Sequence, residues 1–320
     1  MKPIIDMHNH TNLSSCCHDE TATAATFIDK AAEVGIQVLG ISNHCWDNRM
    51  DGASAWYKPQ DVDWVLKIKD EIPEDTKGVK LFVGIETEYR GMCDKIGISA
   101  ENAVKFDYIL IPHSHTHMVN YVIPYDPVYV EALEIVRQKL RAAFPEVSDR
   151  QIDRWVEHAR QPDVKLFEKR PPDIKFLSDF LCDSFVGLLN NAELQKFKDK
   201  VPVFVAHPFI ACGYTAAQAD EAVAMVPDEK FIEMFTLMAE KGVGYDLSVG
   251  NFVRNDKSER EQQFRLLKLA RQCGVKFTFG TDAHSVEGLG SSWKSAQIYK
   301  NGGMTPEDLH PLYRDFVTFD

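Results

Sequence analysis

Short apolar runs that alternate with amphipathic stretches constrain the fold of this chain more than any other feature. Strands that alternate with helices pair in parallel, because each helix returns the chain to the same end of the sheet. Seven parallel strands in one domain predict either a barrel or a doubly wound sheet. The strand-like runs are residues 3–7, 38–42, 81–85, 108–111, 203–206, 243–247 and 277–280.

Helical patterns separate most of these runs, and one region contains helical patterns alone. The first pattern, residues 23–34, ends at Gly35, which is a favourable helix cap. Others cover residues 61–71, 216–225, 228–241, 258–273 and 306–316. Between Met118 and Lys200 we expect helices near 127–143, 148–160, 173–182 and 190–199. The pattern therefore predicts one domain over residues 1–320, with a helical insertion over 118–200 after the fourth strand.

Histidines and carboxylates gather where the strand-like runs end. His8 and His10 follow the first run, and their i, i+2 spacing turns both rings to one side of a strand. Asp282 and His284 repeat this spacing after the last run. In a closed parallel barrel all strand C-termini lie on one face, so such residues converge there. The remaining strand-end residues of this kind are His44, Glu86, His113, His115, His117 and His207.

Charge, cysteine usage and hydropathy exclude several classes of protein. The formal net charge of −12 disfavours long nucleic acids as partners, although small phosphorylated substrates remain compatible with a metal site. Seven cysteines without a CxxC pair indicate free thiols. No signal peptide and no apolar run long enough to span a membrane is present. We expect a cytoplasmic protein that does not enter a membrane, and the sequence sets no expectation for its oligomeric state.

The strand-end motifs together resemble the PHP (polymerase and histidinol phosphatase) superfamily. The resemblance rests on "DMHNHT", "SNH", "GIETEY", "PHSH", "AHP" and "GTDAH", and it covers nearly the whole chain apart from the insertion. It implies an α/β fold, a distorted TIM-like (β/α)7 barrel that binds two to three divalent metal ions. Many members of the superfamily hydrolyse phosphate esters.

The resemblance also implies which residues bind the ions. Glu86 suits a bridging position, because a carboxylate offers two oxygens where an imidazole offers one lone pair. The implied ligands are His8, His10, Glu86 and Asp282 for one ion; Glu86, His115 and His207 for a second; and Asp19, His44 and His284 for a third.

Several of these positions have competitors within the same motif. His18 and Glu20 compete with Asp19, and His113 and His117 compete with His115. Imidazole and carboxylate donors suit zinc, manganese or iron rather than calcium. The neighbouring thiols are expected to be small packing residues: Cys16, Cys17 and Cys45.

The expected activity is metal-dependent hydrolysis of a small phosphomonoester through a hydroxide that bridges the ions. Glu86 and Asp282 would belong to the catalytic centre, and His117 would protonate the leaving group, with Asp246 and His18 as alternatives. Arg254 and Arg90 would bind the phosphate, because guanidinium matches phosphate geometry.

Histidinol phosphate is one candidate substrate, although the "YDLS" strand departs from the wording of histidinol phosphatases. Three other functions compete with the phosphomonoesterase. They are a phosphodiesterase that acts on a nucleotide, an amidohydrolase-type C–N hydrolase, and a metal-binding barrel without catalysis.

Overall fold

A parallel sheet forms the centre of the molecule. The computed structural model describes residues 5–118, 121–124, 127–159 and 173–318. Its main sheet has seven strands, and all neighbouring pairs are parallel, as the sequence predicts. In order across the sheet, these strands are β1 (Ile5–Asp6), β2 (Val38–His44), β3 (Lys80–Glu86), β6 (Tyr108–Pro112), β7 (Val203–Ala206), β8 (Gly244–Ser248) and β9 (Phe277–Gly280).

The two outer strands of this sheet meet and nearly close it. The backbone N–H of Met7, just after β1, donates to the carbonyl of Phe279 on β9 at 2.7 Å. Further along, Asn9 and Ala283 form a parallel bridge. Side chains link the same two strands, because the buried Asp6 carboxylate accepts hydrogen bonds from the backbone N–H and the hydroxyl of Thr281. The fold is therefore a distorted TIM-like (β/α)7 barrel, and the doubly wound alternative is excluded.

A tyrosine fills part of the barrel interior. The hydroxyl of Tyr108 donates to the carbonyl of Met7 at 2.6 Å, and the whole residue is buried. Its ring lies over Gly84 of β3, where an added Cβ would lie only 2.5 Å from the tyrosine Cζ. Glycine is needed at this position because any larger residue would displace the ring. With a packed interior, ligands reach the barrel only at its ends, and sites in such folds form at the strand C-termini.

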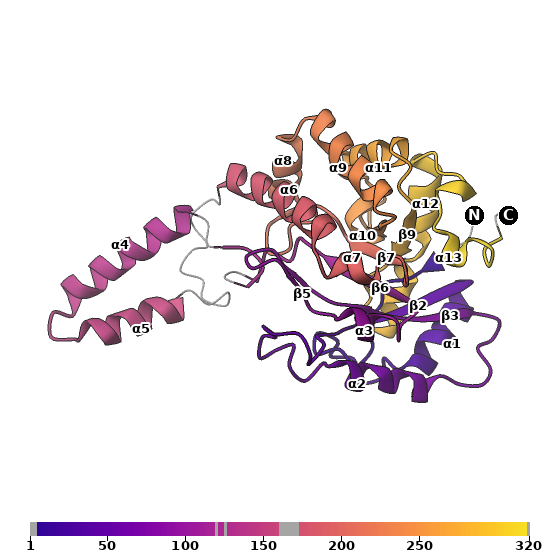
Figure 1. The fold of residues 1–320 in the computed structure, drawn as a ribbon, viewed down its shortest axis with the longest axis horizontal. Coiled ribbons are helices and arrows are strands. Elements are labelled where there is room, and N and C mark those ends of the chain that lie inside the picture. Colours follow the sequence, from indigo (N-terminus) through magenta and orange to yellow (C-terminus); the bar gives the residue numbers. More distant parts are fainter. Residues whose placement is uncertain (1–4, 119–120, 125–126, 160–172, 319–320) are drawn as a thin grey trace.

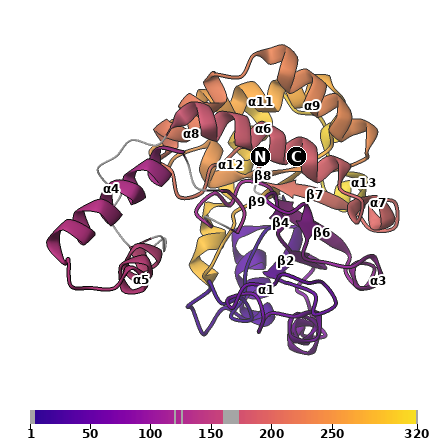
Figure 2. The same cartoon turned by 60° about the vertical axis from the view of Figure 1, so that its left-hand side comes forward.

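Helices cover the outside of the barrel (Figures 1 and 2). Helix α1 (Ala24–Val34) begins with a capping box between Thr23 and Thr26 and ends at Gly35 with a φ of 81°, as expected for a left-handed cap. The others around the barrel are α2 (Val62–Val65), α3 (Ala100–Ala103), α6 (Ile174–Asn190), α7 (Leu194–Phe197), α8 (Ala216–Ala224), α9 (Asp228–Glu240), α10 (Val249–Phe252), α11 (Glu261–Gln272), α12 (Trp293–Asn301) and α13 (Pro311–Arg314).

Some local elements differ from the sequence prediction. The expected helix over 61–71 is a single turn of α2 followed by a 3₁₀ helix, Leu66–Glu71. The expected last helix is likewise divided into a 3₁₀ turn, Pro306–Asp308, and α13. A short antiparallel hairpin of β4 (Tyr89–Arg90) and β5 (Lys95–Ile96) was not predicted, because two-residue strands are too short to show a period.

Two helices project from the barrel as a pair (Figures 1 and 2). Helices α4 (Pro127–Ala143) and α5 (Asp149–Ala159) share a small apolar cluster around Ile152 and Val156. By contrast, α6 contributes Leu181 and Phe185 to the main core. Only part of the region 118–200 therefore stands apart, and the predicted division into barrel and insertion stays a prediction.

The described part of the chain contains no helix with the length and apolar character needed to cross a membrane. All seven cysteines are free, as their spacing predicts.

Candidate metal centre

Glu86, at the C-terminal end of β3, lies at the centre of a cluster of imidazoles. The parallel register places His44 of β2 directly beside it. One carboxylate oxygen, Oε2, lies 3.3 Å from Nε2 of His8, 3.3 Å from Nε2 of His10 and 3.4 Å from Nδ1 of His44. The other oxygen, Oε1, lies 3.2 Å from Nε2 of His207 and 3.8 Å from Nε2 of His115. The strand ends thus bring five histidines to one buried carboxylate.

Asp282 places a second carboxylate beside the same histidines. Its Oδ1 lies 3.2 Å from Nε2 of His10 and 3.6 Å from Nε2 of His8. His284 lies on the other side, with Nδ1 at 3.7 Å from the same oxygen. The chain just after β1 and the chain just after β9 therefore contribute to one site, although more than 270 positions separate them.

The donor atoms fall into four overlapping groups. Within each group, one possible ligand atom from every residue lies within 4.8 Å of the others. The groups are His8, His10 and Asp282; His8, Glu86 and His207; His115, His207 and Cys212; and His10, Cys16, His44 and His284.

The charges within the cluster are strongly coupled. Burial on its own would raise the pKa of Glu86, but the imidazoles of His8 and His44 hold it well below its usual range. Burial lowers the pKa of His8, yet the carboxylates of Glu86 and Asp282 outweigh it and raise that pKa well above its usual value. Buried carboxylates at this density need positive charge beside them, and in this arrangement the histidines would have to supply it by protonation.

Several ring nitrogens in the cluster have no hydrogen-bond partner, and this observation tests whether metal ions fit. Nε2 of His8, Nε2 of His10 and Nδ1 of His44 are buried and form no hydrogen bond, although oxygens of Glu86 or Asp282 lie 3.2–3.4 Å away. A buried polar atom without a partner is costly, so its presence at a site of converging donors points to a ligand. Divalent cations would bind these nitrogens and replace the protons as counter-charge for Glu86 and Asp282. The residues present therefore fit a metal centre.

The opposite nitrogens of three rings are held by oxygen atoms. Nδ1 of His8 lies 2.7 Å from Asp246 on β8, and Nδ1 of His115 lies 2.8 Å from Glu88. Nδ1 of His284 lies 2.8 Å from the carbonyl of Asp282. In metal sites, an oxygen that accepts from one ring nitrogen fixes the tautomer and directs the other nitrogen to the ion.

Sequence reasoning did not identify Glu88 as a support of this site, and it considered Asp246 only as an acid. For Asn43, next to the ligand His44, it raised a supporting role without naming a contact. The one available signal for Glu88 was its position two residues after Glu86. Asn43 Oδ1 accepts hydrogen bonds from the Thr11 backbone and the Ser14 hydroxyl at 2.8 and 2.9 Å. The "SNH" asparagine thus fixes the loop that follows β1.

Two residues of the cluster have unusual backbone conformations. His207 has a φ of 32° and Asp282 a φ of 55°, in the left-handed region that residues other than glycine rarely occupy. Such strain persists only where the surrounding structure enforces it, and it concentrates at functional sites.

The structure separates the three histidines of "PHSHTH". His115 lies beside Glu86, as described above. His113 is buried elsewhere, where its Nε2 accepts a hydrogen bond from the Phe209 backbone N–H at 3.1 Å. His117 reaches the surface but is partly covered by its neighbours, and its ring centroid lies 5.3 Å from that of His115. Partial burial and the neighbouring ring of His115 lower the pKa of His117 to about 4.

The other predicted site residues lie outside the four groups. The Asp19 carboxylate accepts hydrogen bonds from the hydroxyl of Thr21 at 2.6 Å and from the Val286 backbone at 3.2 Å. Arg90 donates to the carbonyls of Gly52 and Tyr121, at 3.0 and 3.3 Å. Arg254 is exposed, in the loop after α10. Their assigned roles stay predictions.

Three aromatic residues beside the site differ in exposure. Trp46 and Tyr57 are fully buried and belong to the packing, whereas Trp56 is 39% exposed. The Trp56 ring meets the His44 ring edge-on, with 5.0 Å between centroids. Among the aromatics of this loop, Trp56 is the one that an incoming molecule can reach.

Comparisons with known proteins agree with this fold. No family model matches the chain. The structure is similar to that of histidinol phosphate phosphatase from Lactococcus lactis subsp. lactis Il1403, solved with zinc, L-histidinol and phosphate. The two share 13% identity and a TM-score of 0.55, over 95% of each chain. A structure from Listeria monocytogenes, named a putative histidinol phosphatase, covers 92% of this chain and 98% of its own, with 12% identity and a TM-score of 0.46.

A short segment is also similar in sequence to curated proteins. Two probable phosphatases, from Thermoanaerobacter sp. (strain X514) and Thermoanaerobacter pseudethanolicus, are each 37% identical over 75 residues. The match spans 23% of this chain and only 30% of the length of each relative. The resemblance expected from the strand-end motifs is thus confirmed for the fold: over nearly its whole length, this chain is structurally similar to a histidinol phosphate phosphatase.

Proposed function

We propose that this chain is a metal-dependent phosphatase that acts on a small phosphomonoester. The observation that carries the proposal is the convergence of unpartnered, buried ring nitrogens of His8, His10 and His44 on Glu86. The shared fold with the Lactococcus enzyme and the short similarity to probable phosphatases favour phosphate esters over other substrates.

The proposed ligands follow the groups around the two carboxylates. His8, His10, Glu86 and Asp282 would hold one ion, and Glu86, His115 and His207 a second. His44 and His284 would contribute to a third, for which the sequence also suggested Asp19. Zinc, manganese and iron all suit the imidazole and carboxylate donors.

The chain contributes orientation and proton control to the proposed reaction. Divalent ions held there would lower the pKa of a water molecule and neutralise charge on the phosphoryl oxygens. Asp246 and Glu88 keep the rings of His8 and His115 in the tautomer that faces the site. We propose that His117, whose ring lies beside that of His115, carries a proton to or from the leaving group. Arg254, exposed after α10, would bind the phosphate, whereas the Arg90 guanidinium already donates to the carbonyls of Gly52 and Tyr121.

Histidinol phosphate is the first specific substrate to test. The support for it is the L-histidinol and phosphate bound in the Lactococcus structure, which shares the fold. An exposed aromatic ring at the rim, Trp56, offers a flat surface on which an imidazole group can stack.

The test is a panel of phosphomonoesters and diesters, assayed with the purified protein after loading with zinc, manganese or iron and again with chelator. We expect phosphomonoester turnover that requires metal. Glu86→Gln keeps the side-chain shape but removes the charge, and should abolish turnover and bound metal together. Lys300→Ala, an exposed control on α12, should retain both. Metal binding with turnover of diesters but not of monoesters would contradict the proposal.

A further inference from the structure

One of the four donor groups contains a cysteine that the sequence analysis treated as a packing residue. We infer that the thiol of Cys16, together with His44 and His284, binds a divalent ion next to the His10 ring. The inference builds on the proposed metal-dependent function, and it gives Cys16 the position that the sequence analysis assigned to Asp19.

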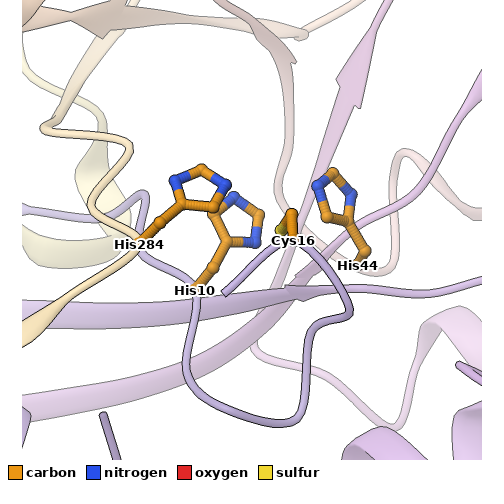
Figure 3. Close-up of side chains that lie close together, drawn as sticks. All are labelled: His10, Cys16, His44 and His284. Atoms are coloured by element: carbon orange, nitrogen blue, oxygen red, sulfur yellow. The ribbon is translucent and has the colours of Figure 1, made fainter. Parts of the chain in front are cut away.

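The side chains already surround one point. Ligand atoms of these four residues lie within 4.8 Å of one another. Figure 3 shows the Cys16 sulfur between the rings of His10 and His44, with His284 beside His10. The ring centroid of His10 lies 4.4 Å from that of His44 and 4.5 Å from that of His284. Ligand atoms on one zinc ion are roughly 3.3–3.8 Å apart, so a shift of about an ångström would bring Cys16, His44 and His284 onto one ion.

A second observation points to a ligand independently of the cysteine. Nδ1 of His44 is buried without a hydrogen-bond partner. His44 is only 7% exposed, so water does not satisfy this nitrogen. An unpartnered, buried imidazole in one group with a half-buried thiol fits a cation better than a packing contact.

The loop that carries Cys16 is fixed on both sides of it. The hydroxyl of Ser14 donates to Asn43 Oδ1 and accepts from the His44 backbone N–H, each at 2.9 Å. On the other side, the Cys17 thiol donates to the His284 carbonyl at 3.1 Å. These contacts tie the loop to the same two segments that supply His44 and His284. The bonds of Asp19 to Thr21 and Val286 also hold this loop, and Asp19 is not a member of the donor group.

A sulfur ligand would change the preference of this position among metals. When a cation binds, a metal–sulfur bond forms and the thiol proton passes to solvent. Thiolate with two imidazoles favours zinc, cobalt or iron(II) over magnesium, calcium and manganese. The chain would therefore hold one softer ion beside the ions bound by Glu86 and Asp282.

Cys212 offers the competing sulfur. It forms a group with His115 and His207, but that group has three donors and no unpartnered nitrogen of its own among the described residues. Any sulfur signal must therefore be assigned to one cysteine or the other by substitution.

Cobalt(II) provides the test, because a thiolate ligand gives it a charge-transfer band in the near ultraviolet. We expect this band in the cobalt-loaded wild-type protein and in Cys93→Ser, whose exposed thiol is a matched control. Cys16→Ser should lose the band and bind one ion about tenfold more weakly or worse, with its circular dichroism unchanged. Bound cobalt without the band, or a band that Cys212→Ser removes and Cys16→Ser retains, would overturn the inference and leave the proposed phosphatase standing. A protein that binds no cobalt at all would overturn both.

A second measurement covers the case in which Cys16→Ser does not fold. The wild-type protein is alkylated with and without zinc, and each thiol is located by tandem mass spectrometry, which separates Cys16 from Cys17. Zinc should slow alkylation of Cys16 about tenfold or more and leave the exposed Cys93 unchanged. Equal alkylation of Cys16 with and without bound zinc would rule out a zinc–sulfur bond there.

Discussion

The carboxylate of Asp246 lies 2.7 Å from Nδ1 of His8, and both side chains are completely buried. This contact joins β8 to the end of β1 and leaves Nε2 of His8 directed at Glu86 and Asp282. Asp246 thus lies outside the proposed ligand set and determines which nitrogen of a central ligand is available.

Replacement of Asp246 by asparagine should weaken metal binding while the fold remains. The amide keeps the shape of the side chain but loses the negative charge that holds the His8 tautomer. Comparable supports of metal ligands contribute about 10–100-fold in affinity. We expect a loss of that size in zinc affinity, measured by competition with a chromophoric chelator. The exposed Asp199→Asn is the control, and unchanged affinity in Asp246→Asn would show that His8 needs no such support.

Gly280 at the end of β9 should not tolerate alanine. An added Cβ would lie 2.2 Å from His8 Cβ and 3.2 Å from His8 Cα, so the backbone beside a ligand would have to move. Overpacking of this kind costs about 1–3 kcal/mol, and here it also displaces the His8 ring. We expect Gly280→Ala to lower both the free energy of unfolding in urea and the bound metal. Gly250→Ala is the matched control, because nothing lies within 4 Å of its added Cβ.

Much of the site could be predicted because the ends of the strands can be recognised in the local sequence pattern. His8, His10, His44, Glu86, His207 and Asp282 each occupy or follow the C-terminal end of a strand, and parallel strands place these ends on one face. The sequence therefore indicated which residues would meet without any knowledge of the distances between them.

Loop residues could not be predicted in the same way, because long-range contacts orient them. The sequence could not show that Val286 would bind Asp19 and leave Cys16 facing the histidines. The alternation of side chains along a strand also ends at Pro112, the last residue of β6. His113 and His115 therefore turn to different surroundings despite their i, i+2 spacing.

Removal of metal should lower the thermal stability of the protein. Without cations, Glu86 and Asp282 depend on protonated histidines for counter-charge, and His8 carries a raised pKa for that reason. Saturation of one site at 100 times its Kd stabilises a fold by about 2.7 kcal/mol, so the melting temperature should fall by several degrees with chelator and recover with zinc. In Glu86→Gln the melting temperature should respond to neither. A wild-type melting temperature that chelator leaves unchanged would contradict a metal centre in this cluster.

His310 should make the fold sensitive to acid independently of the metal centre. It caps α13, where its Nδ1 accepts from the Leu312 backbone N–H at 3.1 Å, and its ring packs on Phe204 at the start of β7. Burial and the neighbouring Lys276 lower the pKa of His310 to about 4 from its usual 6.5. Between these values the unfolded chain binds more protons than the folded one. Stability from this residue is therefore complete above pH 6.5 and decreases as the pH falls toward 4.

His310→Asn isolates this effect, since asparagine also caps a helix but does not titrate. We expect the wild-type protein to lose roughly 1–2 kcal/mol more of its free energy of unfolding than the variant between pH 7 and pH 5. Urea titrations of the chelator-treated proteins at several pH values measure this difference, and chelator keeps metal loss at low pH out of the comparison. Parallel pH profiles for the two proteins would contradict this prediction. They would mean that His310 has the same pKa in the folded and unfolded protein, and that packing against Phe204 does not disfavour the protonated ring.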